Sequence, residues 1–533
     1  MKPQGRLHAD AIANSPVPRA LEGEPPCEYA HRVGQWHLLR TQGCAGQVFT
    51  PIPTARFMAG LIPMNERSIR VLDPGIGTGI LSCAVIEEFV KHEQASHLSL
   101  YAYETDPSNL ATAETVLGHA TKWAQDSDLD IEFHLFDRDF VLAGLDLLGV
   151  EGHLVPGVPV AYDAIIMNPP YFKLNASDPR VLATVKLAGR QTNIYSLFLS
   201  VAAQLLGPSG VLVSINPRSF ASGQYFQAFR QSFFHRVRPT SIHLFDSRKG
   251  LFPGADTLQE TMILAVQIRS NADARNTVSI TASEGLDDID EPRHVEVPLT
   301  DILLPKPERR LIIPTSDEDC RVLRVVRAWT TTLPQLDLKI STGPVVPFRT
   351  KEILLKEDAS EMGRVLPLLW MNNLSQMRVE WPLRNHKPEF ILDVPQSSRL
   401  LVPNERFVLL RRFSAKEERK RLVAAVVPDA MMTTARIGIE NHVNFIHRGM
   451  HGLERNLALG LALLLNSSTM DRYFRILNGN TQVNAYDLRS IPLPDRSIIE
   501  EMGRRYAEKE VASCSEQNAA DFIVEDLIAV PPA

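Results

Sequence analysis

The feature that most constrains the fold is a repeated alternation of apolar strand-like runs and helical segments between residues 46 and 268. Neighbouring parallel strands need a crossover connection, usually a helix, so this alternation is typical of βαβ units. We expect strands at 68–75, 98–107, 131–140, 162–171, 211–217, 241–245 and 260–268, and helices at 80–94, 108–125 and 194–206. The pattern predicts an α/β fold with a Rossmann-like sheet.

The bulk properties of the chain indicate a soluble protein with more than one domain. A chain of 533 residues is too long for one hydrophobic core. Its five cysteines are scattered without a C-x-x-C pair, which favours a reducing cytoplasm over a disulfide framework or a metal site. The longest apolar run, residues 457–465, is about half of what a bilayer requires, so we expect no membrane partner.

Composition divides the chain into five segments. We expect an N-terminal arm at 1–45, the α/β domain at 46–268, a connector at 269–320, a second domain at 321–500, and a C-terminal helix and tail at 501–533. The second domain mixes short strands and helices without βαβ regularity, so a mixed α/β fold is predicted. It is also net basic, which weakly favours a nucleic-acid partner.

A glycine loop follows the first expected strand. It reads Asp73-Pro74-Gly75-Ile76-Gly77-Thr78-Gly79 and leads directly into a helix. Glycines in such a turn let backbone amides approach a ligand closely. The spacing is neither the dinucleotide fingerprint nor a P-loop, so the loop alone leaves a cofactor site and a tight packing turn both open.

Acidic residues at the ends of the next strands favour the cofactor site. Glu104 ends the second strand, where an acid can accept hydrogen bonds from two ribose hydroxyls. Asp139 and Phe140 end the third strand and suit an adenine amino group and ring face. Because these ends meet at the ligand-binding edge of an α/β sheet, the pattern predicts a cofactor that contains adenosine.

The fourth strand brings the segment Asn168-Pro169-Pro170-Tyr171 to the same edge. The side-chain oxygen of Asn168 and the carbonyl of Pro169 are both acceptors, and neither proline nitrogen can donate a hydrogen bond. Two adjacent acceptors suit an exocyclic NH₂ group and can aim its lone pair at an electrophile. Tyr171 offers a face on which a planar base could stack, whereas the role of Phe172 is left open.

These motifs resemble those of the gamma-class adenine-N6 DNA methyltransferases of restriction–modification systems. The resemblance extends over most of the chain and includes Gly46 to Pro51, the run Asn193-Ile194-Tyr195 and Leu251-Phe252-Pro253. It implies a Rossmann-like, S-adenosylmethionine-dependent methyltransferase sheet followed by a DNA target-recognition domain. The cofactor-binding residues implied are Thr50, Pro51, Asp73, Gly75, Gly77, Gly79, Glu104, Asp139, Phe140 and Asn168.

The resemblance also implies a mechanism and partners. Asn168 and Pro169 would hold the amine of an adenine flipped out of double-stranded DNA, with Tyr171 and Phe252 on either side of the base. Pro170 belongs to the same catalytic tetrapeptide. A separately encoded restriction endonuclease would act on the same site. We would then expect the protein in the bacterial cytoplasm, associated with the nucleoid when it is bound to DNA.

Three phrases in the C-terminal part recur in target-recognition regions of this family. They begin at Ser341, Gly438 and Gly479, and their residue roles are not assigned. A basic cluster between Arg411 and Arg421 could contact phosphates or could be a solvated surface.

Three other functions remain open at this stage. The same tetrapeptide occurs in RNA methyltransferases and in protein-glutamine methyltransferases, although those proteins are usually more compact. A fused restriction–modification enzyme would need a nuclease domain, and a non-catalytic DNA-binding scaffold would have no use for complete catalytic motifs. Incubation with labelled cofactor and with DNA, RNA or protein substrates tests the first alternative. Incubation with DNA and magnesium would expose a fused nuclease, and tight cofactor binding without any product would favour a scaffold.

Overall fold

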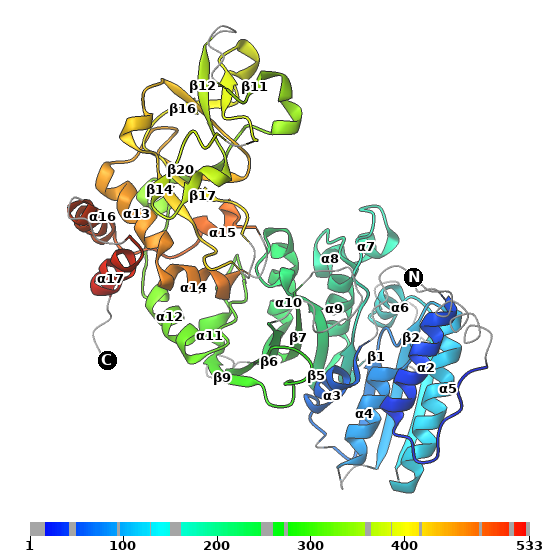
Figure 1. Cartoon of the computed structure of the whole chain (residues 1–533). Helices are drawn as coiled ribbons and strands as arrows, with labels where there is room; N and C mark the ends of the chain where they lie inside the picture. Colours follow the sequence, from blue (N-terminus) through cyan, green and yellow to red (C-terminus); the bar gives the residue numbers. More distant parts are fainter. Residues whose placement is uncertain are drawn as a thin grey trace. The chain divides into compact units, whose positions relative to one another are not determined.

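The computed structural model forms two compact units, Met1–Ser316 and Asp317–Ala533 (Figure 1). It describes residues 16–41, 50–64, 66–92, 96–127, 129–149, 161–246, 260–270, 276–357, 364–384, 386–414, 418–478, 482–510 and 516–528. Within these ranges no helix is both long enough and apolar enough to cross a bilayer. We describe each unit by itself.

A nine-stranded sheet forms the centre of unit 1, in the order β3-β2-β1-β4-β5-β7-β6-β8-β9. Its strands are β1 (Ser68–Asp73), β2 (His97–Glu104), β3 (Asp130–Asp137), β4 (Tyr162–Met167), β5 (Leu206–Pro217), β6 (Val237–Phe245), β7 (Thr261–Ile268), β8 (Thr277–Ser283) and β9 (Arg293–Pro298). The first five are parallel, and β7 runs antiparallel between β5 and β6. The predicted α/β fold with a Rossmann-like sheet is confirmed.

The order of the parallel strands reverses between β1 and β4. From β1 the chain adds β2 and then β3 on one side, and afterwards crosses to the other side to add β4 and β5. At such a reversal the loops after neighbouring strands diverge and leave a crevice outside their carboxyl ends, where open α/β sheets bind ligands. The glycine loop after β1 and the Asn168 segment after β4 flank this crevice.

Helices cover both faces of the sheet. The helices of unit 1 are α2 (Pro26–Thr41), α3 (Ile52–Gly60), α4 (Ile80–Val90), α5 (Pro107–Ala124), α6 (Phe140–Leu147), α7 (Pro179–Ala183), α8 (Val185–Ala188), α9 (Ile194–Gln204), α10 (Gln227–Arg236) and α11 (Leu299–Ile302). One group packs around α4, and the other packs around α9. Strand β2, which has a neighbour on each side, is buried on both faces, whereas the edge strand β3 alternates between half-buried and exposed residues.

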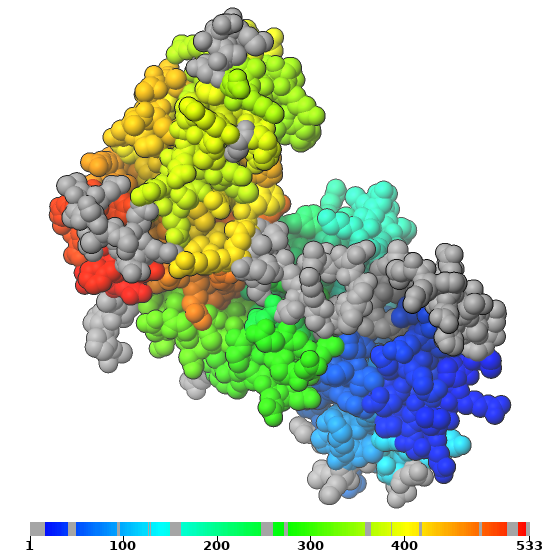
Figure 2. All heavy atoms as spheres, in the orientation of Figure 1, coloured from blue at the N-terminus to red at the C-terminus, as the bar shows by residue number. Residues whose placement is uncertain are grey.

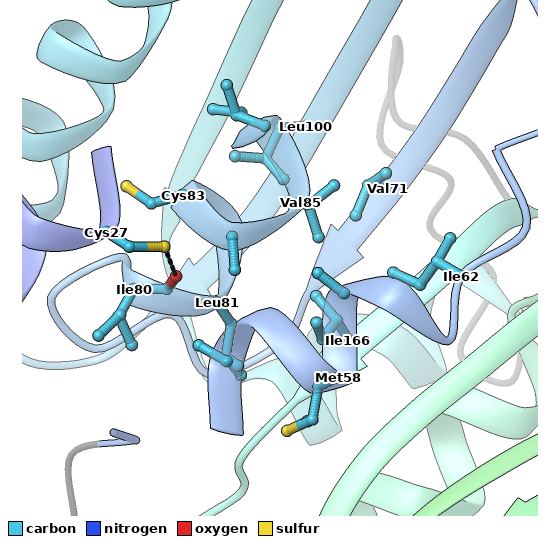
Figure 3. Close-up of a cluster of buried hydrophobic side chains, with 14 of the residues drawn as sticks. Cys27, Met58, Ile62, Val71, Ile80, Leu81, Cys83, Val85, Leu100 and Ile166 are labelled. Atoms are coloured by element: carbon cyan, nitrogen blue, oxygen red, sulfur yellow. Dashed lines mark hydrogen bonds between the residues drawn. The ribbon is translucent and has the colours of Figure 1, made fainter. Parts of the chain in front are cut away.

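The core between α4 and the sheet supports the glycine loop from below (Figure 3). Leu81, Cys83 and Val85 of α4 are buried together with Val71 of β1 and Leu100 of β2. Such close packing fixes the start of α4, and with it the loop that leads into the helix.

Two segments differ from the sequence-based expectation. The predicted N-terminal arm contains α2, which packs on α4 and α5 and buries Cys27 and Val33 (Figure 3). In Figure 2 its dark-blue residues form one continuous surface with the lighter blue residues that follow them. The predicted connector contributes β8 and β9, which extend the sheet beyond β6. Both segments are polar enough that their sequences predict loops. Their helix and strands depend on packing against distant parts of the chain.

Unit 2 combines small sheets with helices. Its strands are β10 (Lys339–Thr342), β11 (Leu354–Leu355), β12 (Val365–Leu369), β13 (Leu374–Ser375), β14 (Arg378–Val379), β15 (Phe390–Leu392), β16 (Leu401–Pro403), β17 (Val408–Arg411), β18 (Ala424–Val426), β19 (Arg436–Ile439) and β20 (Val443–His447). They form sheets ordered β10-β20-β17-β18 and β11-β15-β12-β19-β16, and a β13-β14 pair. The predicted mixed α/β character of this part is therefore confirmed.

The helices of unit 2 include one unusually close pair. They are α12 (Asp317–Arg327), α13 (Arg455–Asn466), α14 (Ser468–Leu477), α15 (Ala485–Arg489), α16 (Arg496–Glu510) and α17 (Glu516–Ile528). Gly460 of α13 and Gly503 of α16 lie where the two backbones touch. A Cβ atom at Gly460 would stand 1.8 Å from the carbonyl oxygen of Ile499, so only glycine fits there.

Candidate cofactor and substrate site

A cavity of about 320 Å³ opens at the carboxyl ends of β1, β2 and β4. Its volume lies at the lower end of the range for small-molecule sites. The residues that line it are Thr50, Pro74, Gly75, Ile76, Gly77, Thr78, Ile80, Leu81, Tyr103, Glu104, Thr105, Asp106, Arg138, Asp139, Phe140, Asn168, Pro169, Pro170, Tyr171, Phe172, Arg180, Ile194 and Phe198. Most of the residues predicted from the motifs therefore come together around one space.

The glycine loop forms one wall of this cavity. Gly77 has φ +56° and Gly79 has φ +96°, conformations that a side chain rarely adopts. Gly79 is the N-cap of α4, so the loop ends at the positive end of that helix. Gly75 and Gly77 present backbone to the cavity, whereas Gly79 faces Val116 of α5.

Asp73 lies under the loop and is fully buried. Its Oδ2 accepts a hydrogen bond of 2.8 Å from the Ser82 hydroxyl. Burial raises the pKa of the Asp73 carboxyl to about 7, against an ordinary value of 3.8. Asp73 is not among the described residues that line the cavity, so its visible role is to anchor the loop to α4.

Glu104 at the end of β2 is held in place by backbone amides. Its Oε2 accepts from Gly77 N at 3.1 Å, and its Oε1 accepts from Thr105 N and Asp106 N at 2.8 and 3.0 Å. A carboxylate has about four lone-pair positions, so these three bonds leave capacity for a ligand hydroxyl. The arrangement joins β2 to the glycine loop and fixes an acceptor at the cavity wall.

Asp139 and Phe140 lie where the chain enters α6, a helix that the sequence pattern did not predict. Asp139 is the N-cap of α6, and its Oδ1 accepts from Leu142 N at 3.1 Å. The ring of Phe140 is buried against Tyr103 and Phe198, with centroid distances of 5.7 and 5.2 Å. These rings give the cavity an apolar wall next to a carboxylate, a combination that suits a planar base with an amino group.

Asn168 directly follows β4, and two neighbours orient its amide group. Its Nδ2 donates to the Thr50 hydroxyl at 3.1 Å, and the Tyr171 hydroxyl lies 2.8 Å from its Oδ1. These contacts distinguish the two ends of the amide, because Nδ2 can only donate and Oδ1 can only accept. An amide oxygen has two lone pairs and can accept two hydrogen bonds.

Tyr171 has a part-buried side chain, although the sequence-based picture left its ring uncovered. Its hydroxyl also lies 2.8 Å from the carbonyl oxygen of Ile215, so one proton serves two acceptors. Burial raises the pKa of Tyr171 well above the usual value of a tyrosine. The group therefore stays protonated and remains a donor at any ordinary pH.

Some predicted residues lie behind the wall or outside the described part of the chain. Pro51 is the N-cap of α3 and, like Gly79, is not among the described residues that line the cavity. Phe252 lies outside the described residues, as do residues 46–49 of the N-terminal motif. Thr50, which follows that motif, is described and reaches the cavity.

The structure also brings residues to the cavity that the motifs did not indicate. Phe198 comes from α9, and Arg180 comes from α7, which lies between the catalytic tetrapeptide and α9. Phe172, whose role the sequence left open, lines the cavity with 42% of its surface exposed. Phe198 lies four residues after Ile194 on one helical face, but nothing in the sequence singles out Arg180.

In unit 2 the first two C-terminal phrases pack against each other. Val345 N donates to Ile439 O at 3.0 Å, and Asn441 N donates to Val345 O at 2.9 Å. A buried Glu440 accepts from His442 N at 3.0 Å and lies 2.5 Å from His442 Nδ1. These phrases therefore form one local structure, whereas the first half of the third phrase, residues 479–481, falls outside the described residues.

The basic cluster is not a uniformly exposed surface. Arg421 is fully buried and donates to the Ser414 hydroxyl. Arg411 donates to Leu374 O, and Arg412 donates to Asn441 O. Many hydrogen-bond donors in the described part of the cluster are thus bonded to other groups of the protein.

The chemistry of the side chains that line the cavity suits S-adenosylmethionine. Three carboxylates, Glu104, Asp106 and Asp139, line it beside two arginines. Each arginine is already paired with a carboxylate, Arg138 with Asp146 and Arg180 with Asp178. Acceptors for ribose hydroxyls and an amino group, together with an apolar wall for a base, match a nucleoside that carries positive charge.

Comparison with known proteins shows the family of this chain. Residues 90–252 match the model of the Eco57I restriction-modification methylase family. The chain is 30% identical to the Type II methyltransferase M.PstI of Providencia stuartii, over 86% of this chain and 89% of that protein. It is 32% identical to M.BsuBI of Bacillus subtilis, over 88% of this chain and 91% of that protein.

A solved structure supports the fold alone. The Type IIL restriction-modification enzyme MmeI, determined in complex with DNA, superposes with a TM-score of 0.55 at 10% identity, over 90% of this chain and 71% of that chain. The fold and the cavity therefore define the protein as a methyltransferase that uses S-adenosylmethionine. More narrowly, the chain belongs to the Type II methyltransferases of restriction–modification systems, whose substrate is DNA.

Proposed function

We propose that the protein transfers the methyl group of S-adenosylmethionine to the N6 amine of one adenine within a specific double-stranded DNA site. The observation that carries the proposal is the oriented amide of Asn168 at the cavity, held by Thr50 on one side and Tyr171 on the other. A fixed acceptor beside an adenosine-type site is what methylation of an exocyclic amine requires.

The residues after β4 position the amine. S-adenosylmethionine, when bound, supplies an electrophilic methyl group. Asn168 Oδ1 and the carbonyl of Pro169 accept the two hydrogens of the amine, and neither Pro169 nor Pro170 offers a competing backbone donor. Accepting both hydrogens reduces the delocalisation of the nitrogen lone pair into the ring and aims it outward.

The target base has to leave the helix to reach this position, because pairing and stacking otherwise enclose its amino group. We assign Tyr171 and Phe252 to the two faces of the extruded base. Tyr171 is well suited since its hydroxyl is tied down, which holds the ring at a fixed angle. Phe252 is assigned from the motif alone.

The remaining assignments follow the cavity wall. Glu104 binds the ribose hydroxyls of the cofactor, Asp139 accepts from its adenine amino group, and Phe140 packs on the adenine ring. Thr50 and Asn168 lie at the methyl-donor end of the cavity. Asp73, Pro51 and Gly79 act indirectly, by fixing the glycine loop and the start of α3.

Unit 2 then serves target recognition, and the enzyme is the modification half of a restriction–modification system with a separately encoded endonuclease. Alignment over about nine-tenths of two proteins named as methyltransferases supports this arrangement over a fused nuclease. Within unit 2, we expect the base contacts to come from the two sequence phrases that pack around Glu440.

Identification of the methylated product tests the proposal. The protein is incubated with methyl-labelled cofactor and with duplex DNA, RNA or a release factor, and the DNA is digested to nucleosides for mass spectrometry. The proposal predicts label in DNA only, as N6-methyldeoxyadenosine. Label in N4-methyldeoxycytidine, in RNA or in protein glutamine would contradict it.

A further inference from the structure

Arg180 reaches the cofactor cavity from a segment that belongs to no cofactor motif. After the catalytic tetrapeptide the chain makes an excursion over residues 174–192, which carries α7 and α8. The excursion is closed at its base, where Leu174 N donates to Thr192 O at 2.7 Å. Arg180 lies in the first turn of α7 and lines the same cavity as Asp139.

Asp178 fixes the guanidinium of Arg180 through a two-pronged pair. Arg180 Nε donates to Asp178 Oδ1 at 2.9 Å, and Nη2 donates to Asp178 Oδ2 at 2.8 Å. Asp178 is also the N-cap of α7 and accepts from Arg180 N at 3.0 Å. Because the guanidinium is planar and rigid, this pair determines where its remaining N–H groups point.

The remaining nitrogen, Nη1, donates to Asp139 Oδ2 at 3.3 Å. Leu142 N holds the other oxygen of that carboxylate at 3.1 Å. Asp139 is therefore held at both oxygens and lies next to a cation. Each oxygen still has a lone pair that can accept a hydrogen bond from a ligand. The carboxylate, however, cannot rotate away from a ligand bound in the cavity.

From this geometry we propose that Arg180 is a positioning residue that makes the cofactor site selective for a purine with a 6-amino group. A carboxylate held in place accepts from an amine but repels the oxygen of a 6-oxo purine, because both are acceptors. A mobile carboxylate could rotate to avoid that clash, so the selectivity depends on Arg180. The inference rests on the assignment of Asp139 under the proposed function.

The chain offers a matched control. Arg70 and Asp163 form the same kind of pair on β1 and β4, with Nε and Nη2 donating to Oδ2 and Oδ1 at 3.1 and 3.2 Å. Neither residue is among the described residues that line the cavity. The substitution Arg70→Met therefore removes a comparable surface pair without touching the site.

The test is a thermodynamic cycle on the full-length protein. Isothermal titration calorimetry measures the affinity of S-adenosylhomocysteine and of its 6-oxo analogue, S-inosylhomocysteine. The proteins are the wild type, Arg180→Met, Asp139→Ala, the double variant and Arg70→Met. We expect Arg180→Met to lower the affinity for S-adenosylhomocysteine about tenfold, as for loss of a charge-assisted hydrogen bond. The affinity for the 6-oxo analogue should fall less than about twofold. Arg70→Met should change neither.

Two results would overturn the inference. One is an equal loss of affinity for both ligands in Arg180→Met, which indicates general packing or direct stacking. The other is an undiminished effect of Arg180→Met in the Asp139→Ala background, which shows that Arg180 does not act through Asp139. If Arg180→Met does not fold, Arg180→Lys replaces it. Lysine keeps the charge but cannot form the two-pronged pair, so it should also lose selectivity.

The cycle separates this inference from the function on which it rests. Should Asp139→Ala keep the full preference for the 6-amino ligand, the assignment of Asp139 is wrong. If Asp139→Ala abolishes the preference for the 6-amino ligand but Arg180→Met retains it, only the role of Arg180 is contradicted. Thermal unfolding of each variant checks that the fold is intact.

Discussion

At the scale of the residue, the site depends on how one amide is held. Asn168 donates to Thr50, which is 118 positions away in the sequence, and its oxygen is approached by the hydroxyl of Tyr171, three positions away. The tetrapeptide alone indicates that acceptors are present, but it does not show that a tyrosine proton is directed at one of them. In this structure the hydroxyl of Tyr171 thus contacts Asn168, in addition to the stacking role that we propose for its ring.

Substitution of Tyr171 by phenylalanine separates these two tasks. The ring remains available for stacking, but the hydroxyl that orients Asn168 is lost. Because one hydrogen bond contributes about 1 kcal/mol, we expect kcat to fall about three- to tenfold with little change in cofactor affinity. Single-turnover methylation and calorimetry measure the two quantities.

A control for that substitution is Tyr29→Phe, which removes a hydroxyl bonded to Pro18 O away from the cavity. This variant should keep the kcat of the wild type. An unchanged kcat in Tyr171→Phe would show that the hydroxyl does not orient the amide during methyl transfer.

The buried carboxyl of Asp73 predicts a pH effect on stability. Its pKa is about 7 in the folded protein against 3.8 when exposed. Between these values the native state binds a proton that the unfolded state does not, so the free energy of unfolding falls as pH rises from about 4 to about 7. The full shift corresponds to about 4 kcal/mol as an upper bound.

The neutral variant Asp73→Asn keeps the shape of the side chain and removes this term. We expect its stability advantage over the wild type to grow between pH 5 and pH 8, as measured by urea unfolding at both values. A difference between variant and wild type that stays constant with pH would mean that Asp73 does not titrate in this range. Comparison of the two proteins cancels the contributions of all other groups.

At the scale of the element, the sequence predicts the βα units that build the site but not everything around them. The strands that became β1, β2 and β4 are apolar runs that are easily recognised, because most of their residues are buried. Strands β8 and β9 lie at the edge and alternate between buried and exposed residues within a polar segment. Their identity depends on pairing with distant strands, which local composition does not reveal.

The close pair α13–α16 gives the element-scale prediction. Gly460→Ala would place a Cβ atom 1.8 Å from Ile499 O, so the helices would have to separate. Overpacking of this kind costs about 1–3 kcal/mol or more, and we expect a lower midpoint of thermal unfolding. The measurement is differential scanning calorimetry of the full chain.

Gly118→Ala is the matched control. Gly118 is exposed on α5, and a Cβ atom there meets nothing within 4 Å. Alanine should raise the stability by about 0.5–1 kcal/mol, since it lowers the entropy cost of the helix. If both variants shifted the midpoint in the same direction, the packing explanation for Gly460 would fail.

At the scale of the whole molecule, the chain forms two compact units, and the cofactor cavity belongs to one of them. All residues of the cofactor cavity come from the unit Met1–Ser316. Ten of the predicted site residues line the cavity, and all of these except Thr50 lie at or just after the end of a strand of the βαβ pattern. Arg180 could not, since its contact with Asp139 spans 41 positions and depends on how the excursion after β4 folds back. The base contacts that we propose for unit 2 are equally absent from any local pattern, because they would depend on its small sheets and loops.

The most direct measurement of the central claim is sequencing of DNA from bacterial cells that express the protein, by a method that reports N6-methyladenine in its sequence context. We predict that one defined sequence carries N6-methyladenine at nearly every occurrence. Expression of Asn168→Ala should leave the same sites unmodified while the purified variant still binds S-adenosylhomocysteine. DNA without N6-methyladenine in cells with the wild type, or full methylation by Asn168→Ala, would contradict the account.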